Sequence, residues 1–105
     1  SLMADTLERL HARFDPMGAV HKKMFGGVCF MLNGNMVAGT SKRGMLVRTG
    51  KDFDDIAERR DDCRIMEMGG RTMVGYWFVE DGMDDEAFDF WINAALAFNK
   101  TLPPK

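Results

Sequence analysis

The side chains that could do chemistry are few in this chain of 105 residues. Two histidines, His11 and His21, and two cysteines, Cys29 and Cys63, supply the groups that acid–base or nucleophilic catalysis most often uses. None of them lies in a recognisable catalytic motif, although a dyad of His21 with Cys29 stays open as an alternative. We expect both histidines to be structural or exposed, and the sequence predicts no catalytic residue.

The same residue types could also bind a metal or form a redox centre. Neither cysteine has a Cys or His at the short spacing of a zinc site, and both lie among strand-like apolar neighbours. We interpret them as two small buried thiols, with a disulfide or redox pair as the alternative. The acids of residues 80–89 lack the spacing of a calcium loop, and no glycine pair matches a nucleotide-binding loop. We therefore predict no metal and no cofactor.

Charged residues are segregated along the chain, although the net charge is only -2. Residues 16–51 hold six bases and no acid, whereas residues 80–89 hold six acids and no base. Solvated hairpin turns and an acid-rich helix start explain both clusters without a partner. The alternative is an electrostatic contact, and the candidates for it are Lys22, Lys23, Arg43 and Arg48.

Nucleic acid is a further partner to weigh, because the basic residues lie near Phe25 and Phe30, which could stack on bases. The chain is acidic overall and has no helix-turn-helix, zinc-finger or RNA-recognition motif. The phenylalanines are also needed for the core. We expect no direct binding to nucleic acid.

The secondary-structure elements that must position these groups follow from periodicity and turn residues. Apolar spacing predicts three helices, at about residues 5–14, 53–60 and 84–100. Asn33-Gly34 is a typical hairpin turn, and five strands are predicted at about residues 22–32, 35–40, 45–49, 63–67 and 72–79. The expected fold class is α+β, an antiparallel five-stranded meander with the N-terminal and C-terminal helices packed on it. We expect residues 3–105 to be one domain, and Ser1 and Leu2 to be foreign residues before Met3.

The predicted strands are apolar on both faces. Val28 and Phe30 point one way while Cys29 and Met31 point the other, and helices can cover only one face. We expect a homodimer that packs sheet against sheet, or a protein partner, to cover the second face. The ten methionines either fill the core or form an adaptable interaction surface, with Met31, Met36 and Met73 as the candidates for that surface.

Several short motifs occur together along the chain. They are a basic pair before Met24-Phe25-Gly26-Gly27, the Asn33-Gly34 turn, the segment from Gly70 to Trp77, the helix containing Trp91 and the ending Leu102-Pro103-Pro104-Lys105. Together they resemble the N-terminal domain of TfoX (Sxy), a bacterial regulator of competence for DNA uptake, and the resemblance covers nearly the whole chain from Asp5 onward.

This resemblance implies an α+β domain without known enzymatic activity. Full-length competence regulators of this type act alongside the cyclic-AMP receptor protein at promoters. We therefore expect a non-enzymatic protein-interaction module that influences transcription or competence, with the transcription machinery among its partners. The alternative is a small-molecule-binding protein or cryptic enzyme with a pocket between sheet and helices. Without a signal peptide or membrane-spanning segment, we expect a cytoplasmic protein.

Overall fold

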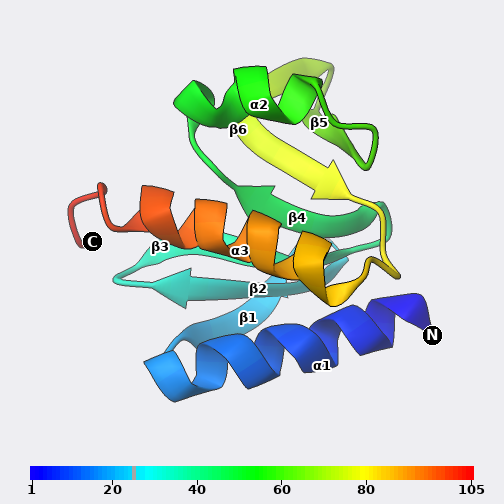
Figure 1. Cartoon of the computed structure of the whole chain (residues 1–105). Coiled ribbons are helices and arrows are strands. Elements are labelled where there is room, and N and C mark those ends of the chain that lie inside the picture. The colour runs from blue at the N-terminus through cyan, green and yellow to red at the C-terminus, as the bar shows by residue number, and fades with distance from the viewer. Residues whose placement is uncertain (25) are drawn as a thin grey trace.

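The computed structural model of the protein describes residues 1–24 and 26–105, so the stacking role considered for Phe25 lies outside the described residues. The chain forms an α+β fold in which helices and strands make separate layers (Figure 1). In chain order the elements are α1 (Leu2–Phe14), η1 (Asp15–Met17), β1 (Val20–Met24), β2 (Gly27–Leu32), β3 (Asn35–Ser41), β4 (Gly44–Arg48), η2 (Lys51–Phe53), α2 (Asp54–Glu58), β5 (Cys63–Met68), β6 (Arg71–Val79) and α3 (Asp85–Asn99).

The two long helices begin at side-chain caps. Ser1 Oγ accepts a hydrogen bond from the Ala4 amide at 3.1 Å, and Asp84 Oδ1 accepts one from the Ala87 amide at 2.8 Å. Such caps satisfy amides that have no partner within the helix. The predicted helices at both ends of the chain are therefore confirmed, and the acid-rich start expected for the last helix is present, with Asp84 as its cap.

The sheet is antiparallel throughout, with the strand order β1-β2-β3-β4-β6-β5. The prediction of five strands was wrong by one, because the run from Lys22 to Leu32 is not continuous. Gly26 has a φ of 74°, and Lys22 pairs with Cys29 of the same run. The meander extends only from β1 to β4. After α2 the chain forms the outermost strand β5 first, and β6 then pairs with β4.

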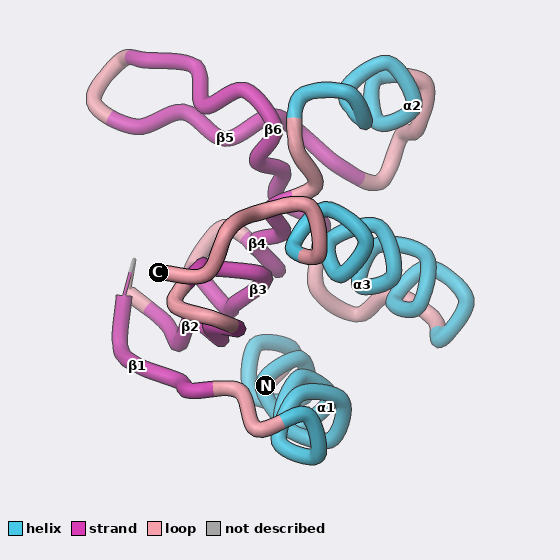
Figure 2. The backbone as a smooth tube through the Cα atoms, turned by 90° about the vertical axis from the view of Figure 1, so that its left-hand side faces the viewer, coloured by secondary structure: helices cyan, strands magenta, loops and turns pink. Residues whose placement is uncertain are grey.

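Helices α1, α2 and α3 lie on one side of the sheet (Figure 2). Their buried side chains, which include Leu10, Phe14, Trp91 and Ile92, pack on Phe30 and Val47 of the strands in the main core. One row of cross-strand partners lies on this helix-covered face of the sheet. It consists of Phe30, Ala38, Val47, Trp77 and Ile65.

Two aspartates accept hydrogen bonds from the two indole groups that the helices bury. Asp54 Oδ1 accepts from Trp77 Nε1 at 2.8 Å, and Asp62 Oδ2 accepts from Trp91 Nε1 at 3.0 Å. Arg60 also binds Asp62 with two hydrogen bonds, from Nε at 2.9 Å and from Nη2 at 2.7 Å. The bonds from Arg60, with the smaller contribution of Trp91, hold the pKa of Asp62 below its usual value.

Replacing Asp62 by asparagine is expected to lower the free energy of unfolding at neutral pH by about 2 kcal/mol, the size of a hydrogen bond to a charged group. Because the pKa of Asp62 is lower in the folded state, its contribution is present above the unfolded-state pKa and is lost as the pH falls through the folded-state value. Urea unfolding at neutral and acidic pH should show the difference between native chain and variant shrinking in acid. Asp61→Asn, at an exposed neighbour, is the control.

Candidate functional site

The face of the sheet opposite the helices, which we call the helix-free face, is crossed by one continuous row of side chains. In this row each residue is the cross-strand partner of the next, from β1 at one edge to β5 at the other. The row consists of Lys22, Cys29, Gly39, Leu46, Phe78 and Arg64. It therefore has an apolar centre and a basic residue at each edge.

The apolar centre is a second, smaller core that contains strand residues only. Leu46, Met66 and Phe78 are buried there, and the half-buried Met36, Met73 and Tyr76 pack against them. We expected a partner to supply the second layer over this face. Within one chain, side chains of the face itself cover part of its centre, and a covering partner stays a prediction.

The three methionines predicted as a surface lie on this face. Met31 and Met36 are cross-strand partners, and Met73 pairs with the buried Met66. All three predicted positions are half-buried, whereas Met45 and Met66 are buried. The core interpretation therefore holds for Met45 and Met66, whereas Met31, Met36 and Met73 remain partly accessible on the helix-free face and their role in an interaction stays a prediction.

Three of the four predicted basic residues also lie on or beside the helix-free face. Lys22 is in the row, Arg48 pairs with Tyr76 with its guanidinium 5.4 Å from that ring, and Arg43 is in the β3–β4 turn. Lys23 does not belong with them. Strand alternation turns Lys23 to the helix side, where its partner Val28 packs on the main core.

Arg64 also belongs to this surface, although it was not among the predicted basic residues. Its Nη2 donates a hydrogen bond to the Arg43 carbonyl at 2.8 Å, and its guanidinium lies 5.7 Å from the centre of the Phe78 ring. Alternation along β5 could have identified it, since Cys63 and Ile65 on either side face the main core.

A groove of about 360 Å³ opens between the β3–β4 turn and the β5–β6 hairpin tip. The buried Met66 and Phe78 form its apolar floor, and Lys42, Arg43 and Glu67 contribute charges to its lining. A groove of this kind fits an apolar side chain with polar or acidic neighbours.

The cysteines do not form a reactive pair. Cys29 lies on β2 in the helix-free row, whereas Cys63 lies on β5 in the main core, with β3, β4 and β6 between them. At about 4.8 Å per strand this separation is far too long for a disulfide, and both thiols are free. Burial raises the pKa of both thiols to about 11, which disfavours the reactive thiolate.

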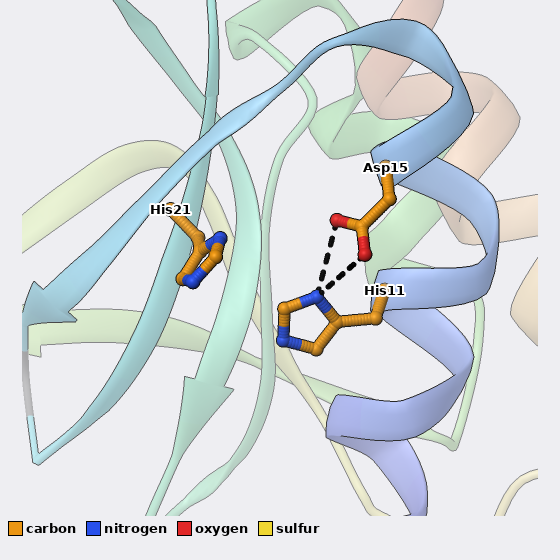
Figure 3. A group of neighbouring side chains, drawn as sticks. All are labelled: His11, Asp15 and His21. Atoms are coloured by element: carbon orange, nitrogen blue, oxygen red, sulfur yellow. Dashed lines mark hydrogen bonds and ion pairs between the residues drawn. The ribbon is translucent and has the colours of Figure 1, made fainter.

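The histidines, by contrast, lie together with an acid that was not predicted to be near them. His11, Asp15 and His21 face one another across the gap between α1 and β1 (Figure 3). His11 Nδ1 lies 3.0 Å from Asp15 Oδ2 and 3.1 Å from Asp15 Oδ1. No His21–Cys29 dyad is formed, because His21 faces the helices and Cys29 faces the other way.

Comparison with known families decides the identity of the fold. The sequence model of the TfoX N-terminal domain matches residues 12–99, most of the chain. The chain belongs to the TfoX N-terminal domain family. Searches of the curated proteins and of the solved structures found no match.

In this TfoX N-terminal domain, the motif residues have structural roles. Asn33 and Gly34 have φ values of 54° and 78°, which the tight turn between β2 and β3 requires. The ending of the chain packs on the same turn, where the Lys105 amide donates to the Asn33 carbonyl at 2.8 Å and Asn35 Nδ2 donates to the Pro103 carbonyl at 3.1 Å.

A second hollow, of about 660 Å³, lies between the start of α1 and the β1–β2 turn of this TfoX N-terminal domain. Its lining is largely apolar, with residues such as Leu7 and Val28, and includes the side chain of Lys23. The small-molecule or enzyme alternative predicted a pocket between sheet and helices; this hollow lies there, and neither His21 nor Cys29 lines it.

Two further observations concern nucleic acid and membranes. Phe30 is fully buried, so it cannot stack on a base as a nucleic-acid platform would require. Within residues 1–24 and 26–105, the structure has no helix that is long and apolar enough to cross a membrane.

Proposed function

We propose that the chain is a protein-interaction module of the TfoX N-terminal type, which uses its helix-free face to bind a partner protein in regulating transcription or competence. The observation that carries the proposal is the helix-free row, which runs across all six strands with an apolar centre and basic edges. No helix residue among those described belongs to its core cluster.

The chemistry of this face defines the partner that it would fit. Half-buried methionines can repack around side chains of varied shape, which suits the centre of an interface. Lys22, Arg43, Arg48 and Arg64 surround that centre and favour acidic groups at the rim of the partner. The groove over Met66 and Phe78 would take one apolar anchor. We infer a partner segment that presents an apolar residue between acidic ones.

The test is affinity purification with the tagged chain from cells that express it naturally, compared with a variant that carries Met36→Glu and Met73→Glu. We expect bound transcription proteins to be lost from the variant, with affinity at least about tenfold weaker, as for truncation of an interface hot spot. Ile56→Glu is the matched control, because Ile56 is an apolar residue of α2 that is 40% exposed on the helix side.

The outcomes of this experiment show whether a partner protein or a second copy of the chain binds the helix-free face. Partners retained equally by the double variant would show that the face is not the binding site. Recovery of the chain alone, with a sedimentation mass twice that of the monomer that falls in the double variant, would identify the occupant as a second copy. A monomer that recovers no partner would contradict the proposed function.

A further inference from the structure

Three side chains with metal-binding atoms meet at the C-terminal end of α1 (Figure 3). His11 lies in the last turn of α1, Asp15 begins η1, and His21 lies in β1. One ligand atom of each lies within 4.8 Å of those of the other two, and no other group of His, Cys, Asp or Glu in the described part of the chain meets this criterion. We propose that these side chains bind one divalent transition-metal ion, with Zn²⁺ as the reference ion.

The helix sets the spacing of the first two ligands. His11 and Asp15 are four residues apart, so their side chains lie on the same side one turn apart. His11 Nδ1 lies 3.0 Å and 3.1 Å from the two carboxylate oxygens of Asp15. Two tetrahedral ligands at typical zinc bond lengths lie about 3.3 Å apart. The pair therefore already has nearly the separation that a shared metal ion requires.

The turn between α1 and the edge strand β1 brings the third ligand, His21, close to the first two. His21 is the cross-strand partner of Phe30, so it faces the helices rather than the helix-free face. The His11 and His21 rings lie 4.8 Å apart between centroids, at 82° to each other. His21 and Asp15 are exposed, so their side chains have room to rotate toward a common ion.

An apolar surface beneath the cluster orients the rings. The fully buried Phe30 lies 4.9 Å from the His11 ring and 5.8 Å from the His21 ring, between centroids. Phe14 stacks on Phe30 at 5.5 Å and supports it from the helix. Residues around the ligands of a metal site commonly fix the orientation of the ligands in this way.

The donor set selects the class of ion. Two imidazole nitrogens and one carboxylate oxygen suit Zn²⁺, Ni²⁺, Co²⁺ or Cu²⁺, whereas Mg²⁺ and Ca²⁺ prefer oxygen ligands. Three protein ligands at an exposed site leave at least one position for water or for a group from a partner. A surface ion pair between His11 and Asp15 would involve only two of the three side chains.

The proposal is tested by titrating ZnCl₂ into the chain, freed of any histidine purification tag, in a calorimeter. We expect one Zn²⁺ per chain, with the dissociation constant raised at least tenfold by each of His11→Gln, Asp15→Asn and His21→Gln. Asp5→Asn is the matched control, because Asp5 is an exposed acid on the same helix and outside the cluster. Zn²⁺ should also shift the NMR signals of both imidazole rings together.

Absence of binding would overturn the proposal, as would Zn²⁺ binding that His21→Gln leaves unchanged. The circular dichroism of each metal-free variant shows whether it is folded. His11 is half-buried, so His11→Gln could unfold the chain. His21 is exposed, and His21→Gln therefore still tests the site if that happens. Both outcomes are independent of partner binding at the helix-free face, since the cluster lies on the helix side of the sheet.

Discussion

Replacing Gly75 by alanine is expected to lower the free energy of unfolding by about 3–4 kcal/mol, from an unfavourable backbone conformation and overpacking together. Gly75 has a φ of 84°, a region that residues with a Cβ rarely occupy. A Cβ there would lie 2.8 Å from the Gly50 carbonyl carbon and 2.9 Å from the Lys51 nitrogen. In a domain of this size the loss corresponds to a melting temperature lower by roughly 12–25 °C.

The backbone around Gly75 cannot easily move away, because several hydrogen bonds converge on this residue. Its carbonyl accepts from the amides of Thr49 at 2.9 Å and of Gly50 at 3.2 Å, and its own amide donates to Asp54 Oδ2 at 3.3 Å. A shift of β6 would therefore disturb the end of β4 and the start of α2 together. Gly75 therefore connects β6 with the end of β4 and with the start of α2.

Gly70→Ala provides the matched control for this prediction. Gly70 has a φ of 78°, close to that of Gly75, but a Cβ there would meet nothing within 4 Å. Its substitution should lower the stability by only about 1–2 kcal/mol, the contribution of the backbone conformation alone. Thermal unfolding of both variants separates the cost of the backbone conformation from the cost of the close contact. Equal losses would contradict the role assigned to the close approach at Gly75.

Local signals were sufficient for most of the secondary structure. The apolar stripe of α3 and its acidic first turn located that helix, and Asn33-Gly34 located the β2–β3 hairpin, because helix caps and tight turns depend on neighbouring residues. The break at Gly26 and the order of β5 and β6 were not predicted. Both depend on which strands pair, and uninterrupted apolar residues such as Val28 to Leu32 do not encode the pairing partner.

The candidate surfaces also depend on which strands and helices come together, and the sequence did not show this. The alternation of β2 correctly separated Phe30 from Cys29 and Met31, but the charge pattern did not show that Lys23 faces the helices or that Arg64 lies beside Arg43. The cluster of His11, Asp15 and His21 was missed because only the turn after α1 brings β1 beside the helix. A His and an Asp four residues apart before a strand containing His was the one signal available.

Replacing Trp91 by alanine is expected to lower the free energy of unfolding by about 4 kcal/mol, within the range for large aromatic residues deleted from cores. The Trp91 side chain is fully buried and lies edge-on to Phe53 and Phe90, with centroid distances of 5.8 Å and 5.5 Å. Removing it leaves a cavity under α3. It also removes one of the donors that hold Asp62 in place, at 3.0 Å. For a domain of marginal stability this loss is a large share of the total.

Trp91→Phe separates the packing of the ring from its hydrogen bond. Phenylalanine keeps much of the aromatic volume but lacks the N–H group, so we expect a loss of about 1–2 kcal/mol. In a chain that already carries Asp62→Asn the loss should be smaller, because the partner of the N–H group is no longer charged. Unfolding should be followed by circular dichroism, since the substitution removes one of only two tryptophan fluorophores. Equal losses for Trp91→Phe and Trp91→Ala would show that the hydrogen bond to Asp62, rather than the packing of the ring, fastens α3 to the sheet.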